Sequence, residues 1–311
     1  MPKAVTLTMN PSLDLSAVAE AVREEEKVRC SAFREDPGGG GVNVARALHR
    51  LGREPQAVFP SGGVYGQRLQ ELLAAEGVRA VAVAIAESTR VNPLVREREG
   101  TQYRFTLPGP ELSPDEREQC LQQVDACLEA GDILVASGSL PPGVPDDFYR
   151  TVTERAHGRG AVVVLDAKGQ LLREALAAGP DWIKPNRREL QELLDDTAGD
   201  EEALFNGARQ LFRDSAVRHL LLSLGSEGVF YCGEGGEARI TNPPVKVKSL
   251  SGAGDTAVAG LIHGLIGGKD PAAAARVAVA AGAAAVLTPG TELLRPEDFQ
   301  ELLEKMEGEA S

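Results

Sequence analysis

The residues with the clearest chemical potential form one short stretch, Gly252-Ala253-Gly254-Asp255. Its glycines predict a tight turn, and the small apolar residues that follow predict a buried helix starting at that turn. The first N–H groups of a helix lack internal partners and carry partial positive charge, so they stabilise a phosphate or a developing oxyanion. A carboxylate there repels an anion unless it has a task, such as accepting a proton from an attacking hydroxyl group. The alternative is that Asp255 only caps the helix.

A second glycine-rich segment, residues 37–41 (PGGGG), precedes a predicted helix over residues 42–51. Apolar residues recur there at helical spacing, and Gly52 ends the pattern. The glycines leave backbone N–H groups uncovered next to a helix start, which makes the segment a second candidate ligand cradle. The alternative is a flexible connector, but a connector does not need such dense glycine directly before a helix.

The surrounding chain alternates short β-prone runs with helical patterns, which is typical of a parallel sheet covered by helices. Strands are predicted at residues 4–9, 56–60, 79–85, 133–137, 162–166 and 219–224. Ligands of such sheets lie at the carboxyl ends of strands, so Ser137, Ser139 and Asp166 are well placed. Residues 88–107 interrupt the pattern with a predicted hairpin around Glu99-Gly100. Together with an extended 12–35 segment, this hairpin can form a small separate sheet, as a lid or an oligomer contact.

Two further features have both a functional and a structural interpretation. Asn186 and Glu189 lie three apart at a predicted helix start and share a face, but a capping pair is an adequate account. Lys27 and Arg29 point to one side if their segment is extended, but a solvated charge run is the simpler account. A glycine-permitted turn at residues 225–228 follows a strongly apolar predicted strand.

The composition restricts the classes of function. The chain has 311 residues, of which 42% are hydrophobic, and a formal net charge of −13. Nucleic acid is therefore not expected as a partner, because phosphate backbones are bound mainly by Lys and Arg. No apolar run reaches the ~18 residues of a membrane span, and the start does not resemble a signal peptide, so we expect a cytoplasmic protein without membrane contact. The four cysteines and four histidines show no metal-ligand spacing.

The remaining pattern fits phosphoryl transfer to a hydroxyl group. No GxxxxGK[ST] stretch is present, so the chain has no Walker-type phosphate loop. No GxGxxG follows the first predicted strand, which counts against a dinucleotide fold. What remains is a glycine-rich anion cradle with an adjacent carboxylate, a second cradle nearer the N-terminus, and scattered cations.

Two segments, PGGGGVNVARALHRLG and SLSGAGDTAVAGLIHGL, closely resemble the two signatures of the ribokinase-like carbohydrate kinases, the PfkB family. TLTMNPSLD, EKVRC, YRFTLPG, SGSLPPGVP, KPNRREL and LLSLGSEG appear in the family's order, so the resemblance covers essentially the whole chain. The segments look most like the branch that phosphorylates fructose 6-phosphate with ATP. The expected reaction is transfer to the C1 hydroxyl group, giving fructose 1,6-bisphosphate in glycolysis. Fructose 1-phosphate and tagatose 6-phosphate remain alternative substrates, and a catalytically silent sugar-phosphate sensor is the non-enzyme alternative.

The resemblance also implies an architecture. We expect an αβα sandwich with a mostly parallel central sheet and a small β-sheet lid. Residues 1–11, 36–87 and 108–311 would form the nucleotide- and substrate-binding body. Residues 12–35 and 88–107 would form a discontinuous lid, through which two copies would join as a homodimer.

The resemblance assigns roles to individual residues. Asp255 would be the general base that takes the proton from the sugar hydroxyl group. The N–H groups of Gly252, Ala253 and Gly254 would form the anion hole for the γ-phosphoryl group, since such transfer depends mainly on positioning and charge stabilisation. The sugar-binding residues would be Asp14, Gly39 and Asn43 for hydroxyl groups and Lys27, Arg29, Arg90 and Ser139 for the phosphate, with Arg90 reaching across from the other subunit. The nucleotide-side residues would be Lys184, Asn186, Ser223, Gly225 and Gly228, and Asn186 and Glu189 would organise Mg²⁺ and its waters.

Some positions depart from the family's usual residues. Glu292 stands where relatives often have Arg, and Pro289 where Gln is common. Because this region holds the family's monovalent-cation site, these two residues put a potassium requirement in question. Residues 166–169 read Asp-Ala-Lys-Gly in place of Asp-Ser-Ser/Thr-Gly, which can alter the sugar contact. An intact carboxylate at the anion hole argues against the sensor, because a pure binder gains nothing from a base there.

Overall fold

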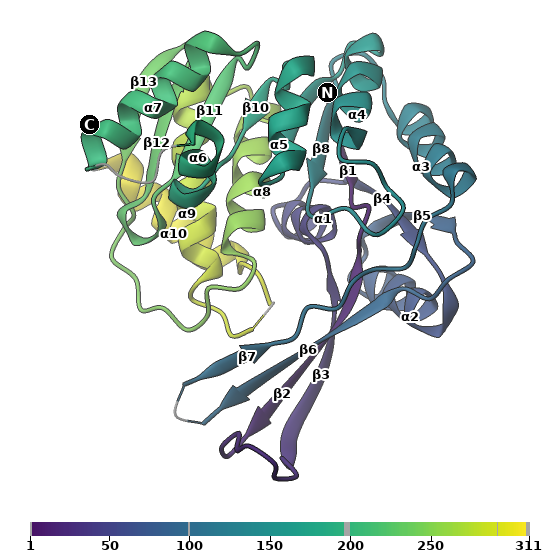
Figure 1. The fold of residues 1–311 in the computed structure, drawn as a ribbon. Helices are drawn as coiled ribbons and strands as arrows, with labels where there is room; N and C mark the ends of the chain where they lie inside the picture. The colour runs from purple at the N-terminus through teal and green to yellow at the C-terminus, as the bar shows by residue number, and fades with distance from the viewer. Residues whose placement is uncertain (1, 99, 196–199, 291, 309–311) are drawn as a thin grey trace.

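The computed structural model describes residues 2–98, 100–195, 200–290 and 292–308. It consists of one large sheet with helices on both faces and a small sheet that projects from the body (Figure 1). This confirms the predicted fold class, an αβα sandwich with a mostly parallel sheet and a small additional sheet. Among the described residues, no helix combines the length and the hydropathy that crossing a membrane requires.

The large sheet places the predicted strand ends along one edge. In spatial order it consists of β13 (Gly236–Ile240), β12 (Val229–Gly233), β11 (His219–Ser223), β10 (Trp182–Ile183), β9 (Val162–Asp166), β8 (Ile133–Ser137), β1 (Ala4–Leu7), β4 (Gln56–Ser61) and β5 (Arg79–Ala84). Neighbours from β11 to β5 pair in parallel, whereas β12 pairs antiparallel with β11 and β13. The carboxyl ends of the parallel strands therefore meet at one edge, where ligands of such sheets bind.

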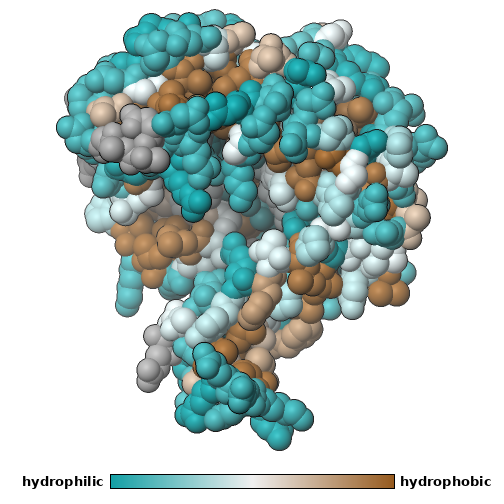
Figure 2. Space-filling model, viewed as in Figure 1, coloured by the Kyte–Doolittle hydropathy of each residue, from teal (hydrophilic) through white to brown (hydrophobic). Residues whose placement is uncertain are grey.

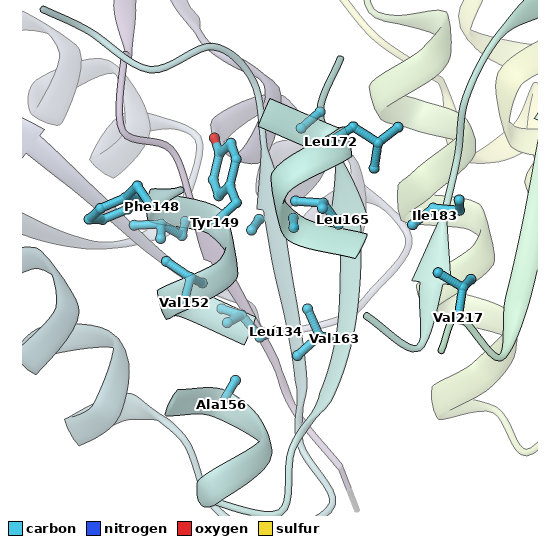
Figure 3. Packing of buried hydrophobic residues seen from close by; sticks show 14 of the residues in the cluster. Leu134, Phe148, Tyr149, Val152, Ala156, Val163, Leu165, Leu172, Ile183 and Val217 are labelled. Atoms are coloured by element: carbon cyan, nitrogen blue, oxygen red, sulfur yellow. The ribbon is translucent and has the colours of Figure 1, made fainter. Parts of the chain in front are cut away.

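Helices bury both faces of this sheet, which explains why the central strands are apolar throughout. One face carries α3 (Pro114–Cys127), α4 (Phe148–Gly158), α5 (Gln170–Ala175), α6 (Arg187–Leu194) and α7 (Glu201–Asp214). The other face carries α1 (Gly40–Arg50), α2 (Gly63–Ala75), α8 (Ala253–Ile266), α9 (Pro271–Ala285) and α10 (Pro296–Gly308). Figure 3 shows Val152 and Ala156 of α4 beside Leu134 of β8 and Val163 of β9 in the first of these cores.

The glycine turn at the head of α8 is held by close helix packing. Glycines in α8 let the Ala-rich α9 approach, because a Cβ on Gly260 would lie 2.5 Å from the Cβ of Ala281. Small residues on both helices thus allow the two backbones to pack closely. This packing anchors the start of α8, and with it Asp255, against the body.

The small sheet is formed by the two segments predicted to leave the main sheet. Its order is β3 (Cys30–Gly38), β2 (Ser12–Ala19), β6 (Arg90–Glu97) and β7 (Gln102–Arg104). β2 pairs in parallel with β6, and the other two pairs are antiparallel. The predicted hairpin is confirmed as β6 and β7, although its turn residue Glu99 lies outside the described residues.

The charge run between β2 and β3 follows the simpler of the two accounts, a solvated segment. Residues 20–29 form neither strand nor helix, so Lys27 and Arg29 do not share a strand face. Both are exposed in the connection from β2 to β3, and Figure 2 shows that the tip of the small sheet is hydrophilic. The charge run is solvated because several consecutive acidic and basic side chains offer nothing to bury.

Candidate active site

The first glycine segment is a tightly packed entry into α1. A Cβ on Gly40 would lie 2.2 Å from the Oγ of Ser137, and one on Gly41 would lie 2.7 Å from the carbonyl oxygen of Leu7. The chain from β3 therefore passes directly against the carboxyl ends of β1 and β8, where no side chain fits. This close approach contradicts a flexible connector and places the first turn of α1 at the site edge of the sheet.

Asn43 in that first turn reaches the predicted base. Its Nδ2 donates to Oδ2 of Asp255 over 2.8 Å, although the two residues are 212 apart in sequence. Behind it, Arg46 is fully buried and donates to the Asn43 Oδ1 over 3.4 Å. Arg46 also donates to Glu76 over 2.6 and 2.8 Å and to the Pro37 carbonyl oxygen over 2.9 Å. This buried network, which the sequence did not reveal, orients Asn43 and through it the carboxylate.

The turn before α8 has the geometry of an anion site. Gly252 has a φ of 77°, which favours glycine, and a Cβ there would lie 2.6 Å from Leu293. The first hydrogen bond of the helix runs from Thr256 N to the Gly252 oxygen over 2.8 Å. The N–H of Gly254 comes before this bond and therefore has no acceptor within the helix. The Nζ of Lys184 lies 3.6 Å from the position that a Cβ on Gly254 would take. A helix N-terminus and an ammonium group thus converge at this turn.

Asp255 faces a cavity and is not a helix cap. The N-cap position belongs to Gly252, with no side-chain hydrogen bond to the helix. Burial and the nearby charge of Asp166 raise the pKa of Asp255 to about 6, against the opposing effects of Asn43, Lys184 and Arg104. An acceptor with this pKa is still ionised near neutral pH and binds a proton more strongly than an ordinary aspartate. The capping-only interpretation is therefore wrong.

Lys184 balances the carboxylates beside Asp255. Its Nζ pairs with Oδ1 of Asp166 over 3.2 Å, and the residue is buried. Burial alone would lower the pKa of Lys184, but the surrounding carboxylates, Asp166 first, raise it above the ordinary value. The ammonium group therefore stays charged at the anion site.

A cavity of about 370 Å³ collects most of the predicted substrate residues. It is lined by Asp14, Gly39, Asn43, Arg90, Ser139, Glu189, Gly252 and Asp255, all predicted from the sequence. The lining also includes Ser12, Asn92, Arg104 and Lys168, which were not predicted as site residues. The small sheet forms one wall of this cavity and the carboxyl ends of the body strands form the other, so a ligand would lie between them.

The lid supplies an acceptor and a cation to the sugar side. Asp14 accepts from Ser12 Oγ over 2.7 Å and from Asn92 Nδ2 over 3.3 Å, and burial raises its pKa. Arg90 donates to the carbonyl oxygens of Asn10 and Leu107 over 2.8 and 2.9 Å. Arg90 lines the cavity of its own chain, and its reach across to another subunit stays a prediction. The backbone carbonyl oxygens of Asn10 and Leu107, at the base of the lid, hold the Arg90 guanidinium group in place.

Arg104 is a site residue that the sequence analysis missed. It ends β7 opposite Leu94, and both residues line the cavity. Its Nη2 donates to the Oγ of Ser251, directly before the glycine turn. The strand periodicity of the YRF segment was the available signal, because residues that alternate along a strand share a face. Arg104 thus connects the small sheet to the predicted anion hole.

The predicted nucleotide-side residues lie beside this cavity but outside its lining: Lys184 and Asn186 follow β10, Ser223 ends β11, and Gly225 and Gly228 lie between β11 and β12. Asn186 and Ser223 form a parallel bridge, and Ser223 donates to the Pro185 carbonyl oxygen over 3.2 Å. Asn242 donates to the Gly225 oxygen over 2.8 Å. A Cβ on Gly228 would lie 2.0 Å from the carbonyl oxygen of Ile240, so this turn requires glycine.

The Asn186 and Glu189 pair caps α6. Each side chain accepts from the backbone N–H of the other, both over 2.9 Å, so the structural interpretation is correct. Glu189 also lines the cavity, and its second carboxylate oxygen makes no hydrogen bond with the described part of the chain. No group of three or more acidic, His or Cys ligands occurs among the described residues. A single carboxylate suits Mg²⁺, which keeps several waters and uses substrate phosphates as ligands.

The remaining predictions concern residues away from the cavity. Lys27 and Arg29 are absent from its described lining. In the predicted cation region, Glu292 pairs with Arg295 over 3.1 Å and lies 3.9 Å from Arg34. Thr291, beside it, lies outside the described residues. The carboxylate that replaces the family's usual arginine is therefore engaged by two arginines of this chain.

Comparison with known proteins agrees with this arrangement. The family model described as "pfkB family carbohydrate kinase" matches residues 6–298 of this chain. The chain is 39% identical to the ATP-dependent 6-phosphofructokinase isozyme 2 of Mycobacterium tuberculosis over 304 residues, 97% of this chain and 89% of that protein. It is 37% identical to the Escherichia coli isozyme 2 over 97% of this chain and 98% of that protein. A tagatose-6-phosphate kinase of Staphylococcus epidermidis is 31% identical over 97% of this chain and 98% of its own length.

Solved structures extend the similarity to the whole fold. The phosphofructokinase-2 of Escherichia coli in complex with potassium superimposes with a TM-score of 0.95 at 36% identity, covering 99% of this chain and 100% of that one. The same Escherichia coli protein in complex with fructose-6-phosphate gives a TM-score of 0.93 at 35% identity, with the same coverage. A tetrameric inhibited form of that protein matches with a TM-score of 0.93 at 36% identity, again covering 99% and 100%.

Proposed function

Because the chain belongs to the pfkB family of carbohydrate kinases, we propose that it transfers the γ-phosphoryl group of ATP to the C1 hydroxyl group of fructose 6-phosphate. The observation that carries the proposal is the placement of Asp255. Its carboxylate faces the cavity with a raised pKa, directly after a helix N-terminus that can hold the phosphoryl group. A carboxylate in that place repels anions, so a proton-accepting task explains it better than binding alone.

In the proposed reaction, Asp255 takes the proton of the C1 hydroxyl group. The hydroxyl oxygen forms a bond to the γ-phosphorus while the bond from this phosphorus to the bridging oxygen breaks, so that ADP leaves. Backbone N–H groups of residues 252–254 and the Lys184 ammonium group stabilise the charge on the transferring group. Mg²⁺, when bound, neutralises phosphate charge, and Asn186 and Glu189 would hold it through water. Asn43 keeps the base directed at the cavity.

The sugar would bind between the lid and the body. We assign hydroxyl recognition to Asp14, Gly39 and Asn43, and phosphate recognition to Arg90 and Ser139. Arg90 offers a charged, partly buried guanidinium group, which suits a phosphate. The Escherichia coli protein with 35% identity was solved with fructose-6-phosphate, whereas a relative with 31% identity is named a tagatose-6-phosphate kinase. Fructose 6-phosphate is therefore the first choice and tagatose 6-phosphate the second.

We also propose that two copies associate through the lid. Phe33 on β3 is 67% exposed and Phe105 beside β7 is 52% exposed, so the lid offers apolar surface that a second copy would cover. Lys27 and Arg29 are exposed in the connection from β2 to β3 and are absent from the lining of their own chain's cavity, so we assign them to the cavity of the other copy. We also propose a cytoplasmic location, because ATP and phosphorylated sugars, the proposed substrates, are available there. The proposal includes no potassium site, because Glu292 is engaged by arginines.

The test is a coupled assay that follows ADP formation with MgATP and each of the three sugar phosphates. We expect kcat/KM to be highest for fructose 6-phosphate, lower for tagatose 6-phosphate and lowest for fructose 1-phosphate. Preference for another of the three would correct the substrate, and absence of turnover with all three would refute the kinase proposal in favour of a binding protein. Asp255→Asn serves as the inactive control.

A further inference from the structure

Lys168 is a cation of the cavity that the proposed reaction does not use. It follows the end of β9 by two residues and lies between buried Ala167 and Gly169, the residue before α5. This short link fixes the backbone of Lys168 at the carboxyl edge of the sheet. Its side chain lines the same cavity as Asp255 and Glu189.

The other cations at the site are already engaged by protein groups. Arg90 donates to two backbone carbonyls, Arg104 to the Ser251 hydroxyl group, and Lys184 pairs with Asp166. Lys168, by contrast, has no hydrogen bond or ion pair with any residue that the structure describes. Its ammonium group is the cationic group of the described lining that remains available to a ligand.

The charge balance of the cavity lining indicates that anionic substrates need an available cationic group there. Its described lining contains the carboxylates of Asp14, Asp166, Glu189 and Asp255 and the cations Arg90, Arg104 and Lys168. Without Lys168, four carboxylates would face two cations, although both proposed substrates are polyanions. A chain with a net charge of −13 has to concentrate cations locally to bind them.

The position of Lys168 distinguishes between the two substrates. β9 lies between β8, which leads to Ser139 on the sugar-phosphate side, and β10, which leads to Lys184 on the nucleotide side. The sugar phosphate already has Arg90 and Ser139. On the nucleotide side, two carboxylates of the described lining, Asp166 and Glu189, lie near Lys184, which is already paired with Asp166. A further cation on this side would therefore favour the binding of nucleotide phosphates.

We propose that Lys168 binds the phosphate chain of the nucleotide, between Glu189 and the glycine turn that precedes Asp255. The inference rests on the proposed function, since it takes the nucleotide to be the phosphoryl donor. It assigns a substrate-binding role to the residue that replaces Ser or Thr in the family's usual Asp-Ser-Ser/Thr-Gly stretch. The contact holds the bound nucleotide and is separate from the proton transfer by Asp255.

The test measures binding of MgATP without sugar, by titration calorimetry, for the native chain, Lys168→Met and Lys168→Arg. We expect Lys168→Met to raise the Kd by about 10- to 100-fold, the range for losing a hydrogen bond to a charged group. Lys168→Arg should keep the Kd within about threefold, because the charge remains. The loss should shrink at high ionic strength, since the group is exposed. Lys305→Met, which removes a lysine from the distant α10, should leave the Kd unchanged.

An unchanged Kd in Lys168→Met would overturn the inference. A normal nucleotide Kd with a raised KM for the sugar phosphate would also overturn it, by moving Lys168 to the sugar side. Because the binding measurement needs no turnover, it remains decisive if no sugar phosphate is a substrate. In that case the proposed reaction would fail while the nucleotide contact could still be established.

Discussion

Replacing Asp255 by Asn separates the two consequences of burying a base at an anion site. The substitution keeps the shape of the side chain and keeps an oxygen that can accept from Asn43 Nδ2. It removes the negative charge, which burial and Asp166 make unfavourable in the folded protein. We therefore expect Asp255→Asn to be more stable than the native chain at neutral pH and at the same time nearly inactive.

The stability gain follows from the shifted pKa. In the folded chain the pKa of Asp255 rises from 3.8 to about 6, and each unit corresponds to about 1.4 kcal/mol of differential interaction. The full shift is worth about 3 kcal/mol, and solvent in the cavity screens part of it. We expect Asp255→Asn to raise the free energy of unfolding by about 2 kcal/mol at pH 7.

The sign of the pH dependence is specific to a raised carboxyl pKa. Between pH 4 and about 6 the folded native chain holds a proton on Asp255 that the unfolded chain has lost, so the native chain loses stability as pH rises through this window. The variant lacks this group. Urea unfolding at several pH values should therefore give equal free energies of unfolding for the native chain and Asp255→Asn below about pH 4. The difference between the two should grow toward pH 6 and stay constant above it.

Turnover should change in the opposite direction. Losing a positioned proton acceptor typically costs about 10²–10⁴-fold, so kcat should fall by this factor while sugar binding is largely kept. Near-normal turnover would show that Asp255 is not the base. Equal or lower stability of the variant at pH 7 would show that the carboxylate is well compensated in the folded chain, and would refute the electrostatic reasoning.

Two further substitutions test the network around the site. Arg46→Met should lower the free energy of unfolding by about 3–5 kcal/mol in urea titrations, because it leaves Glu76 and the Pro37 carbonyl oxygen without their buried donor. Adding Glu76→Gln should recover part of this loss. If the effects of the two substitutions are simply additive, the pairing of Arg46 with Glu76 is contradicted. Arg104→Met should move the acidic limb of the profile of kcat against pH to higher pH, because Arg104 lowers the pKa of Asp255. Arg96→Met, on the same lid, should leave this limb where it is. An unmoved limb in Arg104→Met would exclude electrostatic coupling from the lid to the base.

The sequence alone determined the elements whose formation depends on neighbouring residues. The glycine turn before α8 was predictable because a positive φ, here 77° at Gly252, needs glycine. β8 at Ile133–Ser137 and β9 at Val162–Asp166 were predicted with the correct ends, since short apolar runs bounded by turns suit buried parallel strands. The carboxyl ends of these strands then pointed to Ser139 and Asp166 as cavity residues.

The tertiary structure decided which of these residues meet. The contact between Asn43 and Asp255 joins residues 212 apart, and the buried Arg46 behind them depends on how α1 packs beside α2. Arg104 from the lid and Lys168 from the loop after β9 are site residues because the tertiary structure places both in the lining of one cavity. Short-range patterns specify turns and strands, but side chains far apart in sequence are brought together by strand order and register, which depend on the packing of the whole core.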